Sequence, residues 1–192
     1  MKFIIKLFPE IMVKGTAVKK KMVSQLNDNL RTQLLRINQS IETKRFSDKI
    51  EVFCDDEIAD NVLNVLIKTP GVEQVLQALQ SEAHSLEEIA QAVAQTAVAR
   101  IENKTFVVRV KRTGTHDFTS FEIERFVGSY IYNLGNPTGV DLHNPQVKIE
   151  IEYHQHQLNV IEKRFKGLGG FPLGSQGELL SLMSGGFDST IA

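Results

Sequence analysis

The order in which two apolar periodicities alternate along the first 80 residues constrains the fold more than any other feature. Apolar residues at every second position predict four strands, at residues 2–8, 40–46, 49–54 and 72–79. Apolar residues three or four positions apart predict two amphipathic helices, at 16–37 and 55–68. This βαββαβ order is that of the ferredoxin-like fold, so we expect an α+β protein that begins with such a domain.

A second set of elements follows in the order αβαββ. It comprises a helix from 86 to about 101, a strand at 105–111, a helix at 119–133 and a hairpin of strands 147–153 and 158–165. Ser85 with Glu88, and Thr119 with Glu122, have the spacing of a capping box at the start of each helix. Gly135 suits the C-terminal cap of the second helix.

These patterns divide the chain into four parts. We expect a first domain with its core in residues 1–60 and a last strand that extends to about 80, and a second domain at 61–165. Residues 166–177 hold five of the 13 glycines and read as a linker. Residues 178–192 begin a further domain. Because one strand and one turn cannot bury a sheet, we expect this chain to be part of a longer protein.

Charge and composition narrow the classes of function. Residues 1–50 hold 11 lysines and arginines against four acids, whereas residues 51–102 hold two against ten, which indicates a basic surface for a polyanion. With no run of about 18 apolar residues we expect no membrane partner and a cytoplasmic protein. A single cysteine, Cys54, excludes an internal disulfide, and we expect it to be a small core residue. No tryptophan and 7% aromatics argue against base stacking as the main mode of binding.

The last 15 residues carry a phosphate-binding pattern. A short apolar strand leads into Ser184-Gly185-Gly186-Phe187-Asp188-Ser189, where glycines let backbone amides approach an anion at the start of a helix. The lysine of a Walker A loop is missing. We predict that ATP or pyrophosphate binds at Met183, Ser184, Gly185, Gly186, Phe187, Asp188 and Ser189, and that Asp188 is the candidate to hold Mg²⁺ with ATP.

These motifs bring a family resemblance. Residues 184–189 resemble the PP-loop of ATP pyrophosphatases, and Gly167-Leu168-Gly169-Gly170-Phe171-Pro172-Leu173-Gly174 resembles the linker ahead of it in the ThiI family, the tRNA 4-thiouridine synthetases or tRNA sulfurtransferases. Residues 111–118 and 140–145 resemble a THUMP RNA-binding domain. The resemblance covers nearly the whole chain and implies a ferredoxin-like domain, a THUMP domain and the start of an α/β PP-loop domain.

The resemblance also implies a reaction. Members of the family use ATP with Mg²⁺ to adenylate uridine 8 of tRNA, and then replace its O4 by persulfide sulfur to give 4-thiouridine. It implies a cysteine desulfurase as sulfur donor and, in some members, a sulfur-carrier protein for thiamine thiazole synthesis. The sulfur-carrying cysteines lie downstream of the PP-loop, so we expect no catalytic residue within this chain. We expect a homodimer for the full-length protein, a monomer for this part, and tRNA binding without thiouridine formation by this part alone.

The predicted tRNA-binding residues are cations and loop residues near predicted strand and helix ends. Cations at a helix start oppose the helix dipole, so helix stability does not explain the lysines near residue 20. These cations and loop residues would read RNA by shape, and the resemblance implies that the part of the tRNA they hold is its acceptor end. The predicted set is Lys14, Lys19, Lys20, Lys21, Arg109, Lys111, Arg112, Thr115, His116, Lys163 and Arg164. Three alternatives stay open: a stand-alone RNA-binding module, a PP-loop ATP pyrophosphatase for a small molecule, and a structural pair of domains without a ligand.

Overall fold

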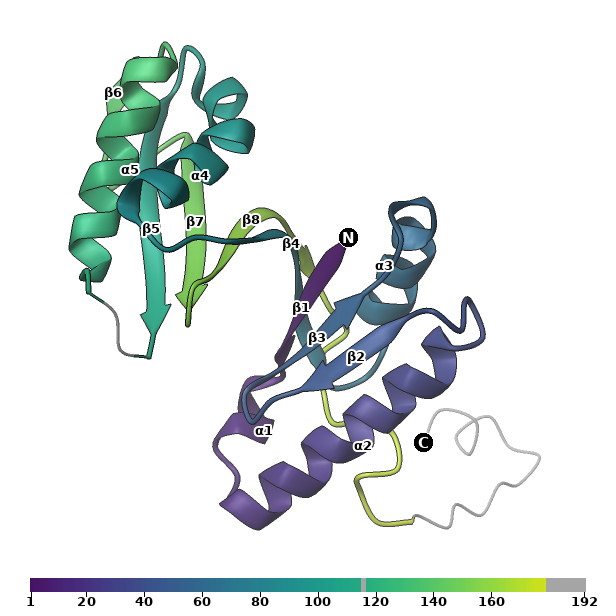
Figure 1. Ribbon diagram of the computed structural model, residues 1–192. Helices are drawn as coiled ribbons and strands as arrows, with labels where there is room; N and C mark the ends of the chain where they lie inside the picture. Colours follow the sequence, from purple (N-terminus) through teal and green to yellow (C-terminus); the bar gives the residue numbers. More distant parts are fainter. Residues whose placement is uncertain (115–116, 179–192) are drawn as a thin grey trace, which may run out of the picture.

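The computed structural model describes residues 1–114 and 117–178, which form two lobes that share one sheet (Figure 1). Within the described residues the sheet has eight strands, in the order β2-β3-β1-β4-β8-β7-β5-β6. The first four strands belong to the N-terminal lobe and the last four to the second lobe, and each lobe carries its own helices (Figure 1). The α+β class and the two-domain order are therefore as the sequence predicts.

The N-terminal lobe has the predicted βαββαβ order with two short additions. Its elements are β1 (Lys2–Leu7), α1 (Pro9–Met12), α2 (Thr16–Leu34), β2 (Glu42–Arg45), β3 (Lys49–Phe53), η1 (Asp56–Ile58), α3 (Ala59–Ile67) and β4 (Val72–Glu82). Pro9 ends β1, as expected, but it also opens the unpredicted helix α1. Both follow from the missing amide hydrogen of proline, which breaks a strand ladder and costs nothing in the first turn of a helix.

The core of this lobe lies between its helices and one face of β1, β3 and β4. Alternate residues of β1 (Phe3, Ile5 and Leu7) are buried there with the apolar stripe of α2. Val62 and Leu66 of α3 are buried in the same cluster. α3 and β4 therefore pack with the first lobe, so its core extends past residue 60, where the sequence pattern placed its end.

The second lobe packs two helices on one face of its strands. Its elements are α4 (Leu86–Ile101), β5 (Thr105–Thr113), α5 (Ser120–Leu134), β6 (Gly139–Val140), β7 (Val147–His154) and β8 (Gln157–Lys166). β5 runs parallel to β6 and β7, whereas β7 and β8 form an antiparallel hairpin. The hairpin turn contains His156 beside the end of β7, as predicted. β6 was not predicted, because two residues are too short to show a periodicity.

The helix caps differ in detail from the expected ones. Thr119 and Glu122 form the full capping box at α5. At α4 the Ser85 hydroxyl accepts a hydrogen bond from the Glu88 amide, but the Glu88 carboxylate accepts from the amide of His84, one residue before the expected partner. Gly135 has φ −93°, so it needs no left-handed conformation; a Cβ there would lie 3.1 Å from Ile101, and close packing explains the glycine.

Pairing of β4 with β8 joins the lobes, and the sequence did not predict it. The two strands are antiparallel from the Gln74–Lys166 pair to the Glu82–Gln157 pair. A small apolar cluster of Ile4, Leu76, Ala78 and Ile161 is buried across this junction. Periodicity identifies a strand but not the edge that it pairs with, so the continuous sheet could not be derived from the pattern alone.

Candidate nucleic-acid interface

The helix-free faces of the two lobes turn toward each other and carry charged side chains. Phe3 and Ile5 of β1 point into the first core, so Lys2 and Lys6 point to the opposite face. The Lys6 ammonium lies 2.7 Å from the Glu152 carboxylate on β7, and Lys2 donates to the amide oxygen of Asn159 on β8 at 2.9 Å. Both contacts cross from one lobe to the other and hold the lobes in a defined orientation.

A buried charge cluster lies beside these contacts. The Glu51 side chain is 6% exposed and pairs with Lys2 at 2.9 Å and with Lys49 at 2.6 Å. Burial opposes ionisation of Glu51, but hydrogen bonds from the two lysines outweigh it, so the pKa of this carboxyl lies below its ordinary value. Burial lowers the pKa of Lys2, and the Glu51 carboxylate partly offsets that effect. The buried charges of Glu51 and Lys2 are therefore paired with each other, and Lys49 pairs with Glu51 as well.

A cleft of about 480 Å³ opens between the lobes at this face, and we call it the interlobe cleft. It is lined by the β2–β3 turn (residues 46–49) on one side and by Lys111, His154 and Gln157 on the other. Lys6 and Glu152 also line it as a pair. Of the predicted tRNA-binding residues that the structure describes, Lys111 is the one that lines this cleft.

A second hollow, of about 540 Å³, lies between the start of α2 and the same β2–β3 turn. Four cations line this basic groove: Lys14, Lys19, Lys20 and Arg45. No carboxylate lines it among the described residues. The N-cap of α2 is Gly15, without a side-chain cap, and the first turn of α2 has no acid. The positive end of the helix dipole thus adds to the lysines, which suits an anion and costs helix stability.

The basic groove includes Arg45, which was not among the predicted residues, and leaves out Lys21, which was. Lys21 is exposed on α2 but does not line the groove. Arg45 ends β2, whose residues are largely exposed, and only the fold of β2 beside α2 brings it to the lysines. A cation at the exposed edge of a short strand is a weak signal in a sequence that has 22 lysines and arginines.

Two of the predicted arginines form internal hydrogen bonds. Arg109 donates to the carbonyl oxygen of Leu142 at 3.0 Å, and its guanidinium lies 3.8 Å from Glu124. Arg112 donates to the carbonyl oxygen of Phe118 at 2.9 Å, which ties the end of β5 to the start of α5. These bonds shape the loops around β5, whatever else the arginines contact. Thr115 and His116, from the same predicted set, lie outside the described residues.

Lys163 and Arg164 lie apart from the basic groove. They line a third hollow, of about 550 Å³, with Arg100 and Lys148. Arg164 donates to the Glu150 carboxylate at 2.5 Å, and although burial opposes ionisation, this bond helps to hold the pKa of Glu150 below its ordinary value. Of the predicted cations, Lys14, Lys19 and Lys20 line the basic groove, Lys111 lines the interlobe cleft, and Lys163 and Arg164 line this third hollow.

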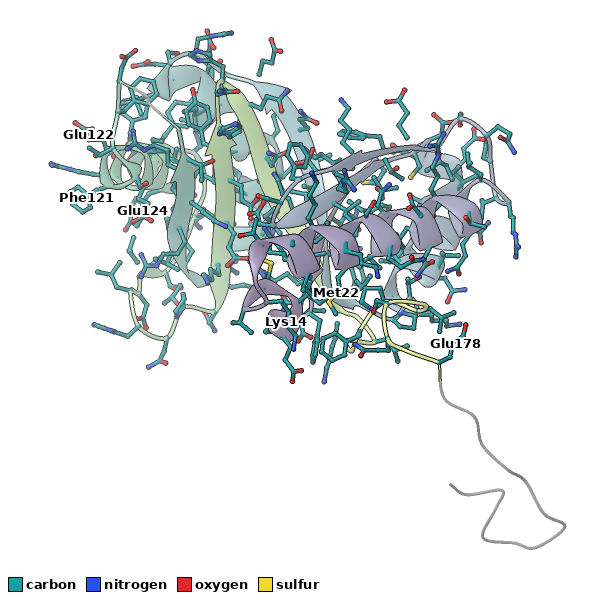
Figure 2. The ribbon with its side chains drawn as sticks, turned by 90° about the horizontal axis from the view of Figure 1, so that it is seen from below. Lys14, Met22, Phe121, Glu122, Glu124 and Glu178 are labelled. Atoms are coloured by element: carbon teal, nitrogen blue, oxygen red, sulfur yellow. The ribbon has the colours of Figure 1, made fainter. Side chains whose placement is uncertain are left out.

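The glycine-rich segment that the sequence identified as a linker is docked on the first lobe. The amide of Gly169 donates to the Val72 carbonyl at 2.7 Å, the Gly71 amide donates to the Gly169 carbonyl at 2.8 Å, and Asn29 on α2 donates to the Leu173 carbonyl at 2.9 Å. The Phe171 ring packs edge-on against Phe8, with ring centroids 5.9 Å apart. Figure 2 shows the segment running along α2 near Lys14 and Met22 up to Glu178.

Replacing Gly167 with alanine is expected to displace this docked segment. A Cβ at this position would lie 2.2 Å from the carbonyl oxygen of Val72, a backbone atom that cannot move aside without breaking β4. We expect a loss of about 1–3 kcal/mol of stability, as for other overpacked sites, and faster hydrogen exchange at the Gly169 amide. Gly177→Ala is the matched control, because a Cβ there meets nothing within 4 Å. Equal amide protection in the two variants would contradict the docking.

Several kinds of site are missing from the described residues. No group of three or more histidine, cysteine, aspartate or glutamate side chains in 1–114 and 117–178 could hold a metal ion. Over the same residues no helix has the length and apolar character to cross a membrane. Burial raises the pKa of the partly buried Cys54 thiol, which disfavours the nucleophilic thiolate. The predicted phosphate loop, Met183–Ser189, lies outside the described residues.

Comparison with known families decides where the chain belongs. The ThiI ferredoxin-like domain matches residues 2–75, and the THUMP domain matches residues 83–161. Together these two matches cover most of both lobes and include every residue that lines the interlobe cleft. The chain belongs to the ThiI family. The N-terminal lobe is accordingly its ferredoxin-like domain, and the second lobe is its THUMP domain, an RNA-binding domain.

Curated relatives and solved structures agree with this assignment. A tRNA sulfurtransferase of Vibrio vulnificus is 46% identical over 193 residues, and one of Saccharophagus degradans is 42% identical over 196 residues. Each match covers all of this chain and 40% of the relative, so the chain spans about two fifths of their length. A crystal structure of a protein from Pyrococcus horikoshii matches with a TM-score of 0.74 at 29% identity. The match covers 91% of this chain and 58% of the Pyrococcus chain.

A structure of a 4-thiouridine synthetase–RNA complex with bound ATP has the same TM-score, 0.74. The match covers 99% of this chain and 48% of that one, at 22% identity, and establishes a common fold.

Proposed function

We propose that this chain is the tRNA-binding part of an ATP-dependent tRNA sulfurtransferase. The basic groove carries the proposal, because Lys14, Lys19, Lys20 and Arg45 converge there without a carboxylate among the described lining residues. Such a surface attracts a polyanion and gains affinity as counterions are released. Relatives that match the whole chain are named tRNA sulfurtransferases, which supports tRNA as the polyanion.

The chemistry that we propose belongs to the longer protein. ATP with Mg²⁺ would adenylate uridine 8 at O4 with release of pyrophosphate. A cysteine persulfide of the longer protein, charged by a cysteine desulfurase, would then attack C4 and AMP would leave with O4. A second cysteine thiol would cleave the S–S bond, which leaves sulfur on C4 and a disulfide on the protein. Sequence motifs alone support the ATP site at Met183–Ser189. A homodimer of the longer protein, a thiamine sulfur-carrier partner and a cytoplasmic location are part of the same proposal. The role of this chain is to hold the tRNA acceptor end, because its described residues offer cations and hydrogen-bonding groups.

Direct binding tests the proposal. The purified chain is titrated with fluorescently labelled tRNA and with a neutral polymer of equal length, at 50 to 200 mM salt. We expect saturable tRNA binding that weakens steeply with salt, because each phosphate contact adds about 0.7–0.9 to the log–log slope. Equal, salt-independent signals for tRNA and the neutral polymer would refute a tRNA-binding function.

Assays of the longer protein distinguish the proposed function from the remaining alternatives. Pyrophosphate release is measured with and without tRNA, and thiolated tRNA is measured when a persulfide donor is added. Release that depends on tRNA supports the sulfurtransferase, whereas release with a small molecule alone supports the rival pyrophosphatase. Thiolation by the 192-residue chain alone would contradict our assignment of the chemistry to the longer protein.

Lys111→Ala is expected to weaken tRNA binding about sixfold at 0.1 M salt, with a fall of about 0.8 in the salt slope, because one phosphate contact is lost. Lys111 is exposed in the interlobe cleft, so the melting temperature should not change. Arg112→Ala is expected to weaken binding as well, but with a lower melting temperature, since Arg112 bonds to the Phe118 carbonyl. Lys104→Ala, at an exposed site outside the three hollows, is the control. An unchanged slope for Lys111→Ala would remove this residue from the interface.

A further inference from the structure

An exposed aromatic ring separates the interlobe cleft from the basic groove. Phe46 lies in the β2–β3 turn and, with Ser47, lines both hollows. Phe46 is 43% exposed, although most phenylalanines of this chain are packed against other apolar residues. Its amide donates to the Lys49 carbonyl at 2.9 Å, which closes the turn and holds the ring between the two hollows. Its place at the boundary of the two hollows, and not its exposure alone, makes this ring a candidate contact for a ligand.

The two hollows that meet at Phe46 differ in charge. The basic groove has four cations and, among the described residues, no carboxylate in its lining. The interlobe cleft is lined by three carboxylates, Asp48, Glu51 and Glu152, and by three lysines, Lys6, Lys49 and Lys111, so its formal charges cancel. Phosphate is therefore attracted more strongly to the groove than to the cleft.

The cleft suits a nucleobase better than a phosphate. Gln155, Gln157 and His154 line it and bring amide and imidazole groups, which both donate and accept hydrogen bonds. A base carries donors and acceptors on its edge and a π-face that stacks on aromatic rings. Phe46 offers such a ring at the boundary between the groove and the cleft. The Lys49 ammonium lies over one face of the ring, 5.0 Å from its centroid, so a base would stack on the opposite face.

We propose that Phe46 stacks on the base of an unpaired nucleotide of the bound RNA. The phosphates of that nucleotide lie over Lys19, Lys20 and Arg45 in the basic groove, and its base enters the interlobe cleft. The inference rests on the proposed tRNA-binding function and deepens it. It makes Phe46 a positioning residue that distinguishes a single-stranded end from a continuous duplex, because bases inside a duplex are already stacked and paired.

The test uses RNA hairpins with and without an unpaired 3′ tail. The tailed hairpin carries 2-aminopurine at one unpaired position, and its fluorescence falls when the base stacks on an aromatic ring. We expect quenching by the wild-type chain, loss of quenching by Phe46→Leu, and recovery by Phe46→Trp. Affinity of Phe46→Leu for the tailed hairpin should fall about 5- to 160-fold, the range found for one stacked base. Affinity for the blunt hairpin and the salt slope should stay the same.

Tyr132→Leu is the matched control, because Tyr132 is 44% exposed on α5 and lines none of the three hollows. Thermal melting of each variant shows that the fold is intact. Wild-type quenching that persists in Phe46→Leu would overturn the stacking proposal, as would equal loss of affinity for tailed and blunt hairpins. A wild-type chain that binds neither hairpin nor tRNA would instead overturn the proposed function itself.

Discussion

Replacing Glu51 with glutamine is expected to lower the free energy of unfolding by about 3–5 kcal/mol, the usual cost of removing one partner from a buried ion pair. The Lys2 side chain is only 4% exposed, and Asn159 would be left as its described hydrogen-bond partner. An amide cannot neutralise the ammonium, so Lys2 must be buried without its counter-charge or lose its proton. Urea unfolding followed by circular dichroism measures the difference.

Glu152→Gln is the matched control for this prediction. It removes a carboxylate from the same face of the sheet, but the pair with Lys6 is more exposed, with side-chain exposures of 25% for Lys6 and 18% for Glu152. We expect a loss of about 1 kcal/mol or less, as for ion pairs near solvent. If the two variants lost the same stability, burial would not be the cause. The double variant Lys2→Met, Glu51→Leu should recover most of the loss, since neither buried charge remains.

The stability of the wild type should depend on pH differently from that of Glu51→Gln. Burial opposes ionisation of Glu51, but the hydrogen bonds from Lys49 and Lys2 keep its pKa below the ordinary value of 4.5. Its contribution to stability is therefore present above pH 4.5 and is lost as the pH falls through the lower pKa of the folded chain. The wild type should lose stability more steeply than Glu51→Gln below pH 4.5.

Local patterns predicted most elements of this fold, and they failed where the cause is not local. The periodicity of α2 and the capping box at α5 lie within a few residues of each other in the chain, so both could be recognised. No local pattern marks Lys2 as buried, yet it is 3% exposed because Glu51 and Asn159, distant in sequence, converge on it. The continuous sheet through β4 and β8 likewise depends on edge pairing across about 80 residues.

The candidate interface shows the same division. Lysines against the helix dipole near residue 20 were a usable signal, because their position costs helix stability and so needs another reason. Arg45 and Phe46 have no such local signature, since a single exposed cation or ring is common on any surface. Few aromatics argued against stacking as the main mode of binding, and composition cannot reveal that one ring lies between two hollows. Arg109 could not be separated from a surface cation before its bond to Leu142 was visible.

The double variant Lys19→Gln, Lys20→Gln is expected to lower tRNA affinity about 40-fold at 0.1 M salt. For each phosphate contact, the binding constant varies as the salt concentration to the power of about −0.8. At 0.1 M salt one contact therefore raises the affinity about sixfold, and two contacts raise it about 40-fold because their effects multiply. The log–log salt slope should fall by about 1.6 in the same titration. Helix stability should not fall, because both lysines precede the middle of α2 and oppose its dipole.

Lys68→Gln, Lys104→Gln is the control that makes this result specific. It removes the same net charge from exposed positions that line none of the three hollows. If binding depends only on the net charge of the chain, both double variants should weaken it equally and change the slope equally. If the basic groove holds phosphates, only the Lys19 and Lys20 pair should lower the slope, because counterions are released where phosphate and cation meet. Equal slopes for both double variants and the wild type would mean that the RNA lies elsewhere, and the groove would then need a different anion.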